Sequence, residues 1–193
     1  REAENIRLGL PTFEDEGMQD EPEPESQKEE HQSYSVYEQA QRYRAAKAVL
    51  QDIYALDAEH AEAVKALEQL WEEGYTVAAH QLGKFYRDDL STLRDHEKAE
   101  HWFRRSAEAG NDFSEYALGK LLLTQKRWDE AMEWLDKAAD RGSQFAQYRL
   151  GKIYLTGEFV PKDAEKALAY LTASANQGNQ FAQYALGKLY LFG

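Results

Sequence analysis

Four places in the sequence repeat one pairing that suits ligand binding, an aromatic ring followed four residues later by a lysine. Residues four apart lie on the same side of an α-helix, so each ring would act together with its lysine. Rings stack on planar groups and lysines attract anions, so the pairs predict a concave groove for an acidic peptide or for single-stranded nucleic acid. The alternative is that the rings fill the space between adjacent helices while the lysines are solvated. The pairs are His80 and Lys84, Tyr116 and Lys120, Tyr148 and Lys152, and Tyr184 and Lys188.

The charge distribution favours a peptide over nucleic acid as the ligand of this groove. The 193 residues carry a formal net charge of −12. Residues 1–33 hold 11 acids and 3 bases, whereas residues 34–193 hold 24 acids and 20 bases. A protein that binds the phosphate backbone needs a clustered basic footprint, which neither part has. We therefore expect a protein or peptide partner, and an acidic one in particular.

The residue types that carry enzyme chemistry are not arranged for it in this sequence. The chain has no cysteine, and none of its five histidines lies in an HExxH frame. It contains neither a GxxxxGK[ST] phosphate loop nor a GxSxG nucleophile turn. We predict no catalytic residue, no cofactor and no metal site. No apolar run is long enough to span a membrane and no signal peptide is recognisable, so we expect a cytoplasmic protein.

An internal repeat predicts the elements that would position the pairs. The tripeptide LGK occurs four times, with spacings of 36, 32 and 36 residues. A second glycine precedes each LGK glycine by nine residues, and an alanine precedes that glycine by eleven. Each unit has the apolar spacing of a helix A, which contains LGK, and a helix B, which ends at the next such glycine. The sequence therefore predicts an all-α fold, an α-solenoid of antiparallel helix pairs.

The same pattern divides the chain into parts. The charge and prolines of residues 1–33 predict an acidic disordered linker, and residues 34–193 predict the solenoid. Residues 34–56 predict one long helix. A helix A without a helix B closes the sequence, so we expect a fragment of a larger protein that self-associates through this uncapped helix. The predicted units are an N-terminal cap pair at 34–74, repeats at 75–110, 111–142 and 143–178, and a truncated last repeat at 179–193.

The third unit carries nearly all of a known repeat pattern, and the chain resembles the Sel-one-like repeat (SLR) proteins, relatives of the tetratricopeptide repeat. The resemblance implies a non-catalytic α-solenoid scaffold that binds other proteins or peptides on a curved face. The first unit departs from the pattern in its loop, and the second lacks most of that loop. The matching residues are Ala146, Leu150, Gly151, Ile153, Tyr154, Gly157, Val160, Asp163, Lys166, Ala167, Tyr170, Leu171, Ser174, Ala175 and Gly178.

The order of segments is also similar to the C-terminal regions of MobP-type mobilisation relaxases from Gram-positive conjugative elements. The resembling stretches are IRLGLPTFEDEGM, RYRAAKAVLQDIYALD and VAAHQLGKFYRDD. In those relaxases the nicking chemistry lies in an N-terminal domain, and no part of this chain matches its motif. The resemblance implies a second possible role, as an accessory module that helps to assemble the DNA-processing complex of conjugation.

Overall fold

The computed structural model describes residues 30–88 and 94–192, and the side chains of 36–88 and 94–191. The predicted acidic linker therefore lies almost wholly outside the described residues. The chain divides into two compact units, Arg1–Ala40 and Gln41–Gly193. The second unit contains nearly all of the predicted solenoid.

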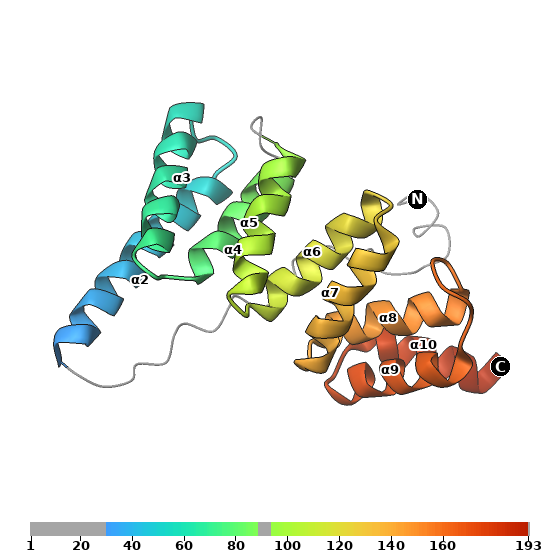
Figure 1. Cartoon of the computed structure of the whole chain (residues 1–193). Coiled ribbons are helices and arrows are strands. Elements are labelled where there is room, and N and C mark those ends of the chain that lie inside the picture. The colour runs from blue at the N-terminus through green and yellow to red at the C-terminus, as the bar shows by residue number, and fades with distance from the viewer. Residues whose placement is uncertain (1–29, 89–93, 193) are drawn as a thin grey trace. The chain divides into compact units, whose positions relative to one another are not determined.

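The described residues fold into α-helices without any strand, which confirms the predicted all-α solenoid (Figure 1). From α3 to α10, each helix packs against the next helix in the sequence. Helices α4, α6, α8 and α10 correspond to helix A, and α3, α5, α7 and α9 to helix B. The bounds are α2 Glu30–Gln51, α3 Asp57–Glu72, α4 Val77–Arg87, α5 His96–Glu108, α6 Asp112–Thr124, α7 Trp128–Asp140, α8 Gln144–Thr156, α9 Ala164–Asn176 and α10 Gln180–Phe192.

The turns that follow α5, α7 and α9 are built in the same way, as the junction of α7 and α8 shows. Gly142 has a φ of 95°, a left-handed conformation that glycine adopts without strain. Its N–H donates to Ala139 O at 2.9 Å, and the N–H of Ser143 donates to Ala138 O at 2.9 Å. Ser143 then caps α8 by accepting from the N–H of Ala146. The turn is therefore specified by a glycine and a small polar residue.

In the three repeats that have both helices, the LGK glycine lies against a large side chain of the following helix B. A Cβ placed on Gly151 would lie 2.7 Å from Leu171 Cγ, and one on Gly119 would lie 2.8 Å from Leu135 Cγ. At Gly83 the nearest atom would be a ring carbon of Phe103, at 2.5 Å. These distances show that helix A approaches helix B closely at the glycine, which accounts for its recurrence. The contact at the glycine sets the separation of helix A from helix B. It also determines which side of helix A faces away from helix B.

The leading helix is shorter at its C-terminal end than the sequence predicts. The expectation of one helix over 34–56 is wrong there, because α2 ends at Gln51. The Asp52 carboxylate accepts a hydrogen bond from the N–H of Tyr54 at 2.9 Å, which favours a turn over a further helical residue. The described part of α2 is joined to the end of α3 by Arg42, whose Nη1 lies 2.7 Å from Glu73 Oε2.

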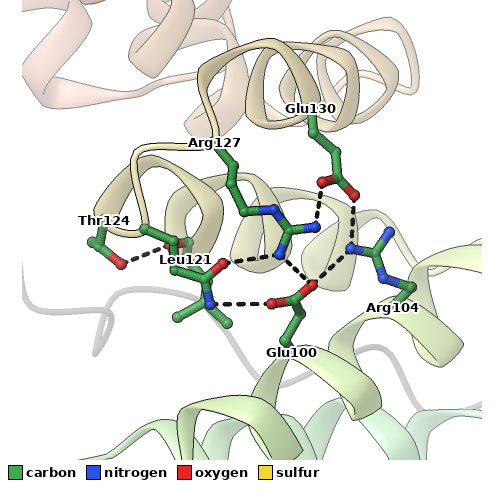
Figure 2. Close-up of polar contacts among 7 residues, drawn as sticks. Glu100, Arg104, Leu121, Thr124, Arg127 and Glu130 are labelled. Carbon is green, nitrogen blue, oxygen red and sulfur yellow. Dashed lines mark hydrogen bonds and ion pairs between the residues drawn. The ribbon is translucent and has the colours of Figure 1, made fainter.

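Two glutamates and two arginines join the first repeat to the second at the shortened loop of the second repeat (Figure 2). Glu100 Oε1 accepts from Arg104 Nη2 at 2.8 Å and from Arg127 Nη1 at 2.7 Å. Arg104 also lies 2.7 Å from Glu130 Oε1, and Arg127 pairs with the same carboxylate. Burial by itself would raise the pKa of Glu100, but these hydrogen bonds outweigh it and the pKa is lowered. The network thus joins α5 to α7 through charged groups in their ionised forms.

Candidate partner-binding face

The four ring–lysine pairs all lie on A helices, and three of the rings contact the next A helix along the chain. His80 of α4 lies with its ring centroid 6.3 Å from that of Phe113. Tyr116 of α6 is 6.0 Å from Phe145, and the corresponding contact in α8 is made by Tyr148 on Phe181 at 5.8 Å. The rings therefore line the junctions between consecutive repeats.

The accessibility of the rings differs along the chain. His80 is 6% exposed and Tyr116 is 3% exposed, whereas Tyr148 is half-buried and Tyr184 is 54% exposed. The His80 ring is also held by a hydrogen bond between its Nδ1 and Ser114 Oγ, at 2.7 Å. The first two rings thus belong mainly to the packing between repeats, and the last two present aromatic surface to the exterior.

Lys120 and Lys188 lie beside their rings, as the four-residue spacing predicts. Lys120 Nζ is 5.5 Å from the centroid of the Tyr116 ring, and Lys188 Nζ is 5.6 Å from that of Tyr184. At this range a cation is attracted to the face of an aromatic ring. Burial raises the pKa of the Tyr148 hydroxyl, and the positive charge of Arg149 opposes the rise. Lys120 and Lys188 therefore present cations over aromatic rings, and the hydroxyl of Tyr148 stays protonated at neutral pH.

Three of these lysines differ from the arginines of the B helices and their turns. Lys84, Lys152 and Lys188 form no ion pair with any residue that the structure describes. By contrast, four arginines of the B helices and turns each contact a carboxylate. These arginines are Arg104, Arg105, Arg127 and Arg141.

Charge is segregated between the two sets of helices. Helices α4, α8 and α10 contain no aspartate or glutamate, whereas α3 and α7 each contain five acids and one lysine. Helix α6 has two acids in its first turn, Asp112 and Glu115. Glu115 is only 2% exposed and its Oε1 lies 3.0 Å from Arg141 Nε. The outer side of the A helices therefore bears cations and rings, and we call it the A-helix face. It is defined by the four ring–lysine pairs and by Arg149.

Arg149 is the residue of this face that the repeat pattern does not predict. It lies one helical turn after Phe145 and three residues before Lys152, so all three share one side of α8. The signal in the sequence is its irregularity, because the corresponding residues are Gln81, Ala117 and Ala185. A repeat pattern contains only residues that recur in each unit, so it does not include Arg149.

No group of three or more histidine, aspartate or glutamate side chains is placed to hold a metal ion among residues 30–88 and 94–192. Within the same ranges, no helix has the length and apolar character needed to cross a membrane.

Comparison with known proteins places this architecture among described repeats. Residues 76–111, 129–143, 144–179 and 180–193, just over half of the chain, match the Sel1 repeat. A comparison with curated proteins gives no significant match.

Two solved structures share the fold. A protective antigen of uropathogenic Escherichia coli with an SLR fold is 26% identical, with a TM-score of 0.68 over 84% of this chain and 36% of that protein. A Sel1 repeat protein from Oxalobacter formigenes is 28% identical, with a TM-score of 0.66 over 79% of this chain and 63% of that protein. The chain thus spans only part of either protein.

Proposed function

Because this chain belongs to the Sel1 repeat family, we propose that it is a non-catalytic scaffold that binds a partner protein or peptide on the A-helix face. The stacked pairs hold the face in shape, and the partner supplies acidic groups to the lysines. Apolar or planar groups of the partner contact Tyr148 and Tyr184, the rings that present aromatic surface. The buried rings of His80 and Tyr116 support the face from beneath.

The observation that carries this proposal is the set of lysines without ion pairs on helices without acids. A lysine that has no carboxylate nearby keeps its full attraction for an incoming anion, because no internal partner must be displaced first. The acidic B helices α3 and α7 would repel the same ligand. The two sets of helices therefore distinguish one side of the solenoid from the other for an acidic partner.

Binding of a fluorescently labelled oligoglutamate peptide tests the proposal. Replacement of Lys84, Lys152 and Lys188 by serine should weaken binding about tenfold, since each exposed charge contributes roughly 0.2–1 kcal/mol. The matched control replaces Lys65, Lys98 and Lys166, three exposed lysines of the B helices, and changes the net charge by the same amount. Equal losses in the two variants would show that only net charge matters and would refute the proposed face. Affinity should also fall as salt is added.

The alternative, an accessory module of a DNA relaxase, rests on the sequence resemblance alone. It predicts binding of single-stranded oligothymidylate that weakens steeply with salt and depends on the same lysines. Selective binding of oligoglutamate would favour the scaffold, and selective binding of oligothymidylate would favour the relaxase module.

We also propose that the chain as given self-associates through α10. Tyr190 and Leu191 are 74% and 76% exposed on this helix. Two such apolar side chains favour contact with another apolar surface. Light scattering should give a mass above that of one chain, and Leu191→Glu should restore the monomer mass. A monomer at all concentrations would contradict self-association.

A further inference from the structure

The charged side chain of Arg149 is partly buried, and no contact with a described residue compensates for this burial. Its Nε is buried and has no hydrogen-bond partner among residues 30–88 and 94–192. Its guanidinium forms no hydrogen bond or ion pair with any other residue that the structure describes. Taking part of a guanidinium out of water is unfavourable unless hydrogen bonds or an opposite charge replace the water. The folded protein therefore holds a cation partly desolvated and ready to accept an anion.

The packing of the repeats does not require an arginine here. The same position is alanine in α6 and α10, at Ala117 and Ala185, and glutamine in α4, at Gln81. Of these helices, α4 and α6 make the same junction with the next A helix, and they do so with neutral side chains. Arg149 is thus an addition to the third repeat rather than part of the repeat's structural pattern.

The surroundings of Arg149 indicate the class of ligand. Lys152, three residues later on the same side of α8, adds a second cation that has no ion pair with a described residue. Phe145, one turn earlier, contributes an apolar edge. A guanidinium donates from a planar fork that matches the two oxygens of a carboxylate, whereas an ammonium acts as a point charge. The combination fits a carboxylate that is attached to an apolar or extended chain.

We infer that Arg149 and Lys152 form an anion-binding point on α8 that anchors one carboxylate of an acidic peptide on the A-helix face. The inference rests on the proposed function and adds to it a fixed position of the peptide along the A-helix face. Most of the face attracts acidic groups without specifying their position, and this point holds one of them. The third repeat is thereby the centre of recognition.

Three variants of the full chain and two probes test this assignment. Arg149→Ala copies the neighbouring repeats, so it should fold normally and keep or raise the melting temperature. It should weaken oligoglutamate binding about tenfold or more, as expected for loss of a charge-assisted hydrogen bond. Arg149→Lys keeps the charge but loses the fork, so it should recover only part of the affinity. Ala117→Ser is the matched control on α6 and should leave the affinity unchanged.

A site-specific signal and the second probe complete the experiment. In the unaltered protein, oligoglutamate should shift the NMR resonance of Arg149 Nε–H. Unchanged affinity of Arg149→Ala, together with weakened binding of the triple lysine variant, would overturn this inference and leave the proposed face intact. If neither change affects binding, both fail. Binding of oligothymidylate through Arg149, without binding of oligoglutamate, would overturn the carboxylate assignment. A large fall in the melting temperature of Arg149→Ala would show a structural role and would also overturn it.

Discussion

The LGK glycines allow one substitution to be tested in two environments within the same chain. A Cβ on Gly151 would lie 2.7 Å and 2.9 Å from carbons of the Leu171 side chain and 3.2 Å from the Leu171 backbone nitrogen. A Cβ on Gly187, the same position in α10, has nothing within 4 Å. The variants Gly151→Ala and Gly187→Ala therefore make the same chemical change with and without a steric neighbour.

The two variants should change the free energy of unfolding by different amounts. Alanine in place of glycine within a helix gains about 1 kcal/mol from backbone propensity. At Gly187 this gain stands alone, so we expect stabilisation of about 0.5–1 kcal/mol. At Gly151 the added methyl must displace Leu171 at a cost of about 1–3 kcal/mol, which leaves a net loss of roughly 0–2 kcal/mol. The difference between the variants removes the propensity and isolates the overpacking.

Urea unfolding followed by far-UV circular dichroism measures both values. The spectrum of each folded variant serves as the control that helix content is unchanged. The expected result is a separation of about 1–3 kcal/mol, with Gly151→Ala the less stable variant. Equal effects in the two variants would refute the close approach of α8 and α9, and with it the reason given for the recurring glycine.

Two further predictions concern buried or bridged carboxylates. The pKa of Glu100 is lowered in the folded state, so this group stabilises the fold above the ordinary glutamate pKa of about 4.3, and the contribution is lost as pH falls through the folded value. Glu100→Gln should lower the free energy of unfolding at neutral pH by about 1–3 kcal/mol. It should also reduce the dependence of that free energy, measured in urea, on pH below neutrality. An unchanged pH dependence would show that the network in Figure 2 contributes nothing to stability. Burial raises the pKa of Glu115 in the folded state, and the charge of Arg141 opposes the rise. The contribution of Glu115 to the free energy of unfolding is therefore fully present below the unfolded pKa and is lost as pH rises through the folded value. The residues at the same position in α8 and α10 are Gln147 and Gln183, which donate to the carbonyls of Ala139 and Ala175. Glu115→Gln should therefore raise the melting temperature at pH 7. A lower melting temperature would mean that the bond to Arg141 outweighs the cost of burying the carboxylate.

Much of the fold was predictable because it depends on local spacing. The constant offsets between LGK, the second glycine and the alanine report which side of each helix is small and where each helix must stop. Asp163, one of the residues that match the repeat pattern, caps α9, and its carboxylate accepts from the N–H of Lys166 at 3.0 Å. Failure of the same reasoning at residues 52–56 has a local cause as well, because the Asp52 side chain competes with the helix for the backbone.

The candidate face was predictable only in part. Helical periodicity places Tyr116 and Tyr148 on the same side of their helices, but it does not say how near the next helix lies. The nearness of Phe145 and Phe181 decides how much of each ring is covered. Likewise, nothing in the sequence shows that Arg149 Nε is withdrawn from water, because that depends on the neighbouring repeat.

The sequence by itself determined the repeat, the pairing of helix A with helix B, and the lysines that line the A helices. These follow from residue types at fixed separations along one chain. Only the tertiary structure decided which rings are buried, which cations have internal partners and where an unpartnered guanidinium remains. Those properties depend on distances between segments about 30 residues apart, such as Tyr116 and Phe145, and a one-dimensional period contains no measure of such distances.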